Sequence, residues 1–148
     1  MPATRRQFVG SVLVGAAGLP LLGRNASAQP TEPSYTEIHH PADPAHPTGA
    51  ERERAPTLSL PARVHAARPF ELGITIGQPP RRGSPEDHVE WIEVRAGTGP
   101  VARISLGPAA SLPSVRLWIE LPASTTLRVL AMWSQNGLWE TLHAVTVT

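Results

Sequence analysis

Histidine and carboxylate side chains gather in one short stretch of this sequence. His39, His40 and His46 surround Asp43 within eight residues. Imidazole nitrogens and carboxylate oxygens are ligands for divalent metal ions, so the stretch is a candidate metal site. The same stretch is rich in proline and shows neither strand nor helix periodicity. We therefore favour a Pro/His-rich linker or arm over residues 29–55, with a tail metal site as the alternative.

The remaining polar residues predict little chemistry. No Cys is present, which excludes disulfides, thiolate metal sites and Cys nucleophiles. Ser84 and Ser134 have no triad-like context, and Gly-rich phosphate loops are absent. A metal cluster of His65, His88 and His143 is an alternative that their spacing does not predict. Thirteen basic side chains against twelve acidic ones give no reason to expect a nucleic-acid partner.

The first 28 residues are typical of an export signal. Arg5 and Arg6 precede an apolar run over residues 12–22, and small residues at 26–28 suit a signal peptidase. This pattern predicts a twin-arginine signal peptide and a periplasmic mature protein with no membrane segment after cleavage. An ordinary secretion signal or an uncleaved anchor is the alternative.

Period-two alternation of apolar residues dominates the rest of the chain. The predicted strands, stronger ones first, cover residues 70–76, 115–121, 127–133, 57–60, 89–94, 101–106 and 138–147. No stretch predicts an amphipathic helix. We expect an all-β domain over residues 56–148, an immunoglobulin-like antiparallel sandwich of about seven strands. The four tryptophans are expected in its core rather than in a binding cleft.

Two motifs carry a resemblance to a known family. The first covers Ser84–Val94 and contains the run Glu90–Glu93 (E-W-I-E); the second covers Thr126–Glu140 and contains Gly137–Trp139 (G-L-W). Together they resemble the iron domain of the desulfoferrodoxin and superoxide reductase family, in the family's order and near its usual separation. The resemblance covers about two-thirds of the chain and implies a seven-stranded sandwich of immunoglobulin type.

The resemblance also implies where iron ligands would lie. The family holds ferrous iron with four imidazoles and an axial cysteine thiolate. The positions that match those ligands here are Arg54, Arg81, Asp87, Trp133 and Asn136. All five ligands are replaced by residues of other types, so we expect no cofactor and no catalytic residues.

His88, next to Asp87, is an alternative metal ligand if the motif slips by one residue. A slip of one turns every side chain of a strand to the other face, and Glu90–Glu93 match the family without a gap. We therefore favour the ligand-free interpretation. It describes an exported superoxide reductase-like domain that has lost its iron centre and binds an unknown protein partner or a small anion at the former active-site loops.

Two other function classes stay open at this point. One is an iron-dependent oxidoreductase of the superoxide reductase type, with Fe held by atypical ligands. The other is a sulfur-compound carrier of immunoglobulin-like fold. Such a carrier attaches its substrate to a Cys, so the absence of Cys counts against it.

Overall fold

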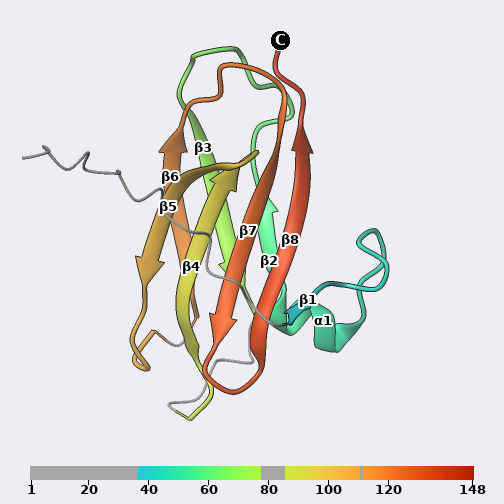
Figure 1. Ribbon diagram of the computed structural model, residues 1–148, viewed down its shortest axis with the longest axis vertical. Helices are drawn as coiled ribbons and strands as arrows, with labels where there is room; N and C mark the ends of the chain where they lie inside the picture. The colour runs from blue at the N-terminus through green and yellow to red at the C-terminus, as the bar shows by residue number, and fades with distance from the viewer. Residues whose placement is uncertain (1–36, 78–85, 111) are drawn as a thin grey trace, which may run out of the picture. The chain divides into compact units, whose positions relative to one another are not determined.

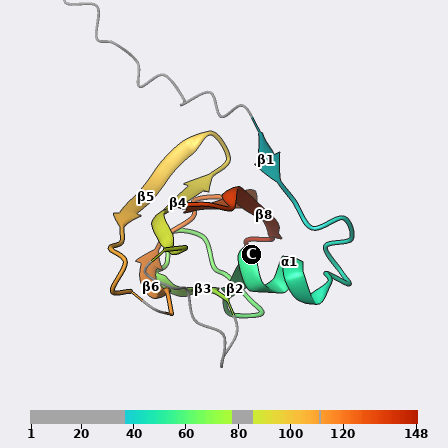
Figure 2. The same ribbon diagram turned by 90° about the horizontal axis from the view of Figure 1, so that it is seen from below.

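Two β-sheets form the described part of the chain, which covers residues 37–77, 86–110 and 112–148 of the computed structural model (Figure 1). Its elements are β1 (Ile38–His39), α1 (Gly49–Arg54), β2 (Pro56–Ser59), β3 (Phe70–Ile76), β4 (Val89–Ala96), β5 (Gly99–Ser105), β6 (Ser114–Ile119), β7 (Thr125–Trp133) and β8 (Gly137–Val145). One sheet has the order β1-β8-β7-β4-β5 and the other β2-β3-β6. Figure 2 shows them edge on as two layers.

The core lies between the two layers and follows from the alternation of side chains along each strand. On β3, Phe70, Leu72, Ile74 and Ile76 are buried while the residues between them are half-buried. The opposing side chains come from β4 and β7: Ile92, Val94, Leu127, Val129 and Ala131. These facing apolar sets confirm the predicted all-β sandwich. Each predicted strand has an observed counterpart, and the bounds of β3 agree at both ends.

Strand pairing brings the two sequence motifs together at one end of the sandwich. β4 pairs antiparallel with β7, with Val89 opposite Trp133. β7 pairs antiparallel with β8, with Trp133 opposite Gly137, whose φ of 73° suits a glycine after a tight turn. The residues before β4 and the β7–β8 turn therefore lie side by side.

The arm before β2 carries two elements that the sequence analysis did not predict. β1 pairs in parallel with β8, placing Ile38 opposite Leu138 and His39 opposite Trp139. α1 has six residues and none of them is buried, so it has no apolar stripe to detect. Its sequence signal is the capping box, in which Thr48 and Glu51 bond each other's backbone amides.

The tryptophans do not all lie in the core. Trp133 is buried, Trp91 and Trp139 are half-buried, and Trp118 is 71% exposed. The core prediction is wrong for Trp118 because it alternates with Leu117 and Ile119, and so falls on the outer face of β6.

Two sequence predictions concern residues outside the described part. These are the export signal over residues 1–28, with Arg5 and Arg6, and the position of Arg81. Within the described ranges, no helix is long and apolar enough to cross a membrane.

Candidate functional site

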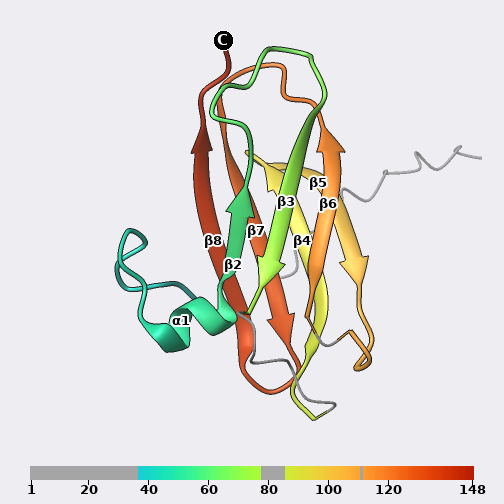
Figure 3. The same ribbon diagram turned by 180° about the vertical axis from the view of Figure 1, so that it is seen from behind.

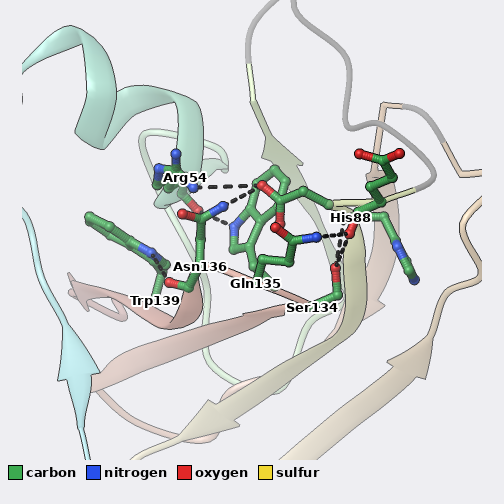
Figure 4. Close-up of polar contacts among 9 residues, drawn as sticks. Arg54, His88, Ser134, Gln135, Asn136 and Trp139 are labelled. Carbon is green, nitrogen blue, oxygen red and sulfur yellow. Dashed lines mark hydrogen bonds and ion pairs between the residues drawn. The ribbon is translucent and has the colours of Figure 1, made fainter.

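Trp133 is the innermost residue of the candidate site. It ends β7, and its side chain is 8% exposed in the hydrophobic core. Its indole Nε1–H donates a hydrogen bond of 3.1 Å to the backbone carbonyl of Arg54 (Figure 4). The ring thereby fills the space between the sheets and ties the α1–β2 junction to the end of β7.

Three polar side chains lie around this ring. Asp87 comes two residues before Val89, the residue that pairs with Trp133, so the two side chains share a face. The amide Nδ2 of Asn136 donates to Oδ2 of Asp87, and the guanidinium of Arg54 lies 3.8 Å from the same oxygen. Arg54 and Asp87 are 33% and 27% exposed, so water weakens their attraction. The hydrogen bond from the Asn136 amide holds the Asp87 carboxylate in place.

Hydrogen bonds to the backbone fix the β7–β8 turn beside these side chains. The Ser134 amide donates to the His88 carbonyl at 2.9 Å, and the His88 amide donates to the Ser134 hydroxyl at 3.1 Å. The carbonyl of Glu86 accepts from Ser134 Oγ at 3.2 Å and from Gln135 Nε2 at 2.7 Å. The turn is therefore positioned before any ligand arrives.

Trp139 closes the other side of the turn. Its Nε1–H donates to the Asn136 carbonyl at 3.0 Å. Its ring faces the ring of His39 from β1, with centroids 5.2 Å apart and planes tilted by 31°. A side chain at Gly137 would place its Cβ 3.3 Å from His39 Nε2, so the absence of a side chain there lets β1 approach.

His88 lies apart from this cluster. Side chains alternate along extended backbone, and Figure 4 shows the His88 ring directed away from Arg54 and Asn136. Its Nδ1 is buried, and no hydrogen-bond partner reaches it within the described part of the chain.

The structure brings four of the five predicted positions together: Arg54, Asp87, Trp133 and Asn136. Their correspondence to iron ligands stays a prediction. Their chemistry does not suit ferrous iron. A guanidinium has no acceptor, an indole N–H only donates, and the Asn136 nitrogen is used as a donor. Asp87 supplies the one anionic oxygen donor among these four, whereas the family resemblance implies iron held by imidazole and thiolate.

The histidines considered as metal ligands lie apart. His39 packs on Trp139, His40 Nδ1 lies 3.7 Å from Glu140, and His46 Nδ1 lies 3.0 Å from Asp43. His65 contacts Thr148 instead, at 3.3 Å. Among the residues that the structure describes, no group of three or more His, Asp or Glu side chains is arranged to hold a metal ion.

Two buried carboxylates on the outer face of the larger sheet were missed by the sequence analysis. Glu140 is 4% exposed and accepts from the guanidinium of Arg128. Glu93 is 7% exposed and pairs with Arg95 at 3.2 Å and Arg103 at 3.0 Å. The Glu140–Arg128 and Glu93–Arg103 pairs join different strands, so predicting them requires the register between strands. Glu93 and Arg95 lie at alternate positions of one strand, and their spacing is visible in the sequence.

Comparison with known proteins relates most of the sandwich to one family. The family model for desulfoferrodoxin matches residues 46–142. A variant of the superoxide reductase (neelaredoxin) from Ignicoccus hospitalis is similar, with a TM-score of 0.62 and 22% identity over 75% of this chain and 94% of that one. A protein assigned as a superoxide reductase from Thermotoga maritima is also similar, with a TM-score of 0.61 and 20% identity over 77% and 95% of the two chains.

A protein of a different class shares the fold. The sulfur carrier protein SoxY from Chlorobium limicola gives a TM-score of 0.52 at 17% identity, covering 78% of this chain and 86% of its own. No match was found among curated proteins. At these identities the solved structures show the fold alone.

Proposed function

Since this chain belongs to the desulfoferrodoxin family, whose model matches 97 of its residues at 46–142, we propose that it is a member that has lost the iron centre and acts as a binding module. Its ligand is a protein partner or a small anion held by the loops around Arg54 and Asn136. The observation that carries this proposal is the hydrogen bond from the Trp133 indole to the Arg54 carbonyl. That bond holds the Trp133 ring in the interior of the site, in the position where the proposal replaces a metal ligand by a packed side chain.

The polar rim favours a partner that brings negative charge. Arg54 lies 3.8 Å from Asp87, which is long for a hydrogen-bonded ion pair, and a third of its side chain is exposed. Asp87 is already held by Asn136. The guanidinium therefore keeps donors for a carboxylate of a protein partner or for a small oxyanion.

Anaerobic reconstitution with Fe²⁺ tests the loss of the iron centre. After removal of excess metal, elemental analysis of the purified protein is expected to give far less than one iron per chain. His88→Asn serves as the matched variant, because it removes the imidazole adjacent to Asp87 in the sequence. Stoichiometric iron that disappears in His88→Asn would overturn the proposal.

Binding at the rim is tested separately. Immobilised protein is exposed to a periplasmic extract, and phosphate is titrated in parallel by calorimetry. A partner or anion retained by the unaltered protein is expected to be lost in Arg54→Gln and kept in Arg116→Gln, whose guanidinium is exposed on β6. Equal retention by both variants would contradict a role for the rim.

An iron-dependent oxidoreductase with atypical ligands is the second candidate function. Buried His88 Nδ1 favours it, since an imidazole nitrogen with no partner in the described residues is available to a metal. His88 Nδ1 is a single nitrogen on the face opposite Asp87. One donor does not make a coordination site, so we prefer the binding module. The iron titration with His88→Asn separates the two candidates.

Export to the periplasm is part of the proposal. It is supported by the sequence around Arg5 and Arg6 and by the small residues at 26–28. Removal of residues 1–28 takes three arginines with it and leaves a slightly acidic mature chain, for which we propose neither a nucleic-acid partner nor a membrane contact.

A further inference from the structure

A cavity lies beside the α1–β2 junction, apart from the Trp133 site. Its volume is about 260 Å³, and it opens where the arm before α1 passes the edge of the sandwich between β2 and β8. Figure 3 shows α1 and the preceding loop beside the ends of these two strands. The apolar part of its wall is made by prolines of the arm and by side chains of the strands: Pro41, Pro44, Pro47, Pro56, Leu58 and Leu142.

The walls of this cavity are held by specific hydrogen bonds. The Glu51 carboxylate accepts from the backbone amides of Ala42 at 2.9 Å and Thr48 at 2.7 Å, which closes the loop of the arm. The hydroxyl of Thr141 donates to the Pro56 carbonyl at 2.7 Å, which joins β8 to β2. The cavity is therefore preformed, and a ligand would not have to order the arm when it binds.

The cavity wall contains one guanidinium, that of Arg52, and one carboxylate, that of Glu140. Glu140 is buried, but its carboxylate is compensated by the guanidinium of Arg128. Arg52 lines the cavity from α1 and forms no ion pair with the residues that the structure describes. His40 and His143 line it as well, and His40 Nδ1 lies 3.7 Å from the Glu140 carboxylate.

We propose that this cavity binds a small carboxylic acid with an apolar ring or short chain. Pockets for drug-sized ligands typically measure about 300–1,000 Å³, so this one suits a molecule of about one ring. The apolar part would bury against the prolines and Leu142. The carboxylate would accept the paired N–H donors of Arg52, the geometry in which a guanidinium binds a carboxylate best.

This proposal is independent of the one for the Trp133 site. Arg52 and Arg54 are two residues apart on α1, so their side chains leave the helix in different directions. Arg54 faces Asp87, whereas Arg52 faces the cavity. A ligand in the cavity therefore leaves the Arg54–Asp87 contact in place.

Titration of the purified protein with benzoate, followed by amide chemical shifts, tests the proposal. Saturable shifts are expected at Leu58, Thr141 and Leu142. Benzyl alcohol has the same ring without the charge, and it is expected to bind about tenfold more weakly. Shifts concentrated at Trp133 and Asn136 instead would overturn the proposal and place the anion at the other site.

Matched variants isolate the guanidinium. Arg52→Gln is expected to weaken benzoate about tenfold, the usual cost of losing a charge-assisted hydrogen bond. Arg68→Gln removes an exposed arginine from the β2–β3 connection and is expected to change nothing. Leu142→Ala, at a side chain that is 56% exposed, is expected to weaken benzoate through lost apolar contact without unfolding the domain. Absence of saturable binding, or equal affinity in Arg52→Gln and Arg68→Gln, would overturn the proposal.

Discussion

The Trp133 side chain contributes both apolar packing and a hydrogen bond. Its ring supplies apolar volume to the core, and its single N–H meets the Arg54 carbonyl at 3.1 Å. A carbonyl so close to the core needs a donor, because a buried acceptor without one costs free energy. The indole is thus built into the packing of the arm on the sandwich, and replacing it by a small metal ligand would open a cavity as well as remove a bond.

Trp133→Phe isolates the hydrogen bond from most of the ring packing. We expect the free energy of unfolding to fall by about 1–2 kcal/mol, from the lost N–H donor and the small void that phenylalanine leaves. Denaturant titration followed by circular dichroism measures the change. Trp118→Phe is the control, and because that ring is 71% exposed its effect is expected to stay within about 0.5 kcal/mol. Equal effects of both substitutions would show that the indole bond contributes nothing.

At the scale of elements, alternation in the sequence predicts the long strands well. Leu72, Ile74 and Ile76 can be recognised as one buried face because two residues per repeat is a purely local signal. β1 and α1 escape such reasoning for physical reasons. β1 has two residues and owes its existence to parallel pairing with β8, about a hundred positions later, and α1 buries no side chain. Short elements held by tertiary contacts carry no periodic pattern.

The candidate site was predictable in a different way. Two motifs singled out Asp87, Trp133 and Asn136, and a separate resemblance at residues 53–56 singled out Arg54. The fold places these four residues around one ring. The bond from Trp133 to a backbone carbonyl 79 residues earlier could not be foreseen, because it depends on how the arm passes the sheet. The same holds for the cavity beside Arg52.

Glu51 is the residue on which the closed arm depends. Hydrogen bonds from the backbone amides of Ala42 and Thr48 hold the pKa of its carboxyl below the ordinary value of 4.5. A lowered folded-state pKa means that the charged form stabilises the arm above the ordinary pKa. This stabilisation is lost as the pH falls through the folded value. We expect the protection of the Ala42 and Thr48 amides, measured against the intrinsic exchange rate at each pH, to fall as the pH is lowered through this range.

Glu51→Gln at neutral pH separates this residue from other groups that titrate nearby. The pKa of Asp43 is also lowered, chiefly by its hydrogen bond from His46, so acid alone does not identify the responsible carboxylate. Faster exchange at Ala42 and Thr48 is expected in Glu51→Gln. In Asp43→Asn, faster exchange is expected at Ala45 instead, because the Ala45 amide donates a hydrogen bond of 2.9 Å to the Asp43 carboxylate. Unchanged exchange at Ala42 and Thr48 in Glu51→Gln would contradict the assigned role.

For the whole molecule, the α1–β2 junction separates two surfaces of different chemistry. On one side the arm is bonded to Trp133 through the Arg54 carbonyl; on the other it roofs the cavity that Arg52 lines. The core is buried by facing residues of the strands, so the loss of a metal centre that we propose is compatible with this architecture.

Export is the property of the full chain that its sequence predicts most directly. The double variant Arg5→Lys, Arg6→Lys keeps both positive charges but removes both guanidinium groups. Lysine does not replace arginine where a receptor recognises the planar donors of the guanidinium. In cell fractions, we expect the unaltered protein in the periplasm, shortened to begin near Gln29. The double variant is expected at full length in the cytoplasm. Arg24→Lys, beyond the apolar run, is the matched control and should be exported normally. Export and shortening of the double variant would assign the chain to a route that does not recognise the arginine pair.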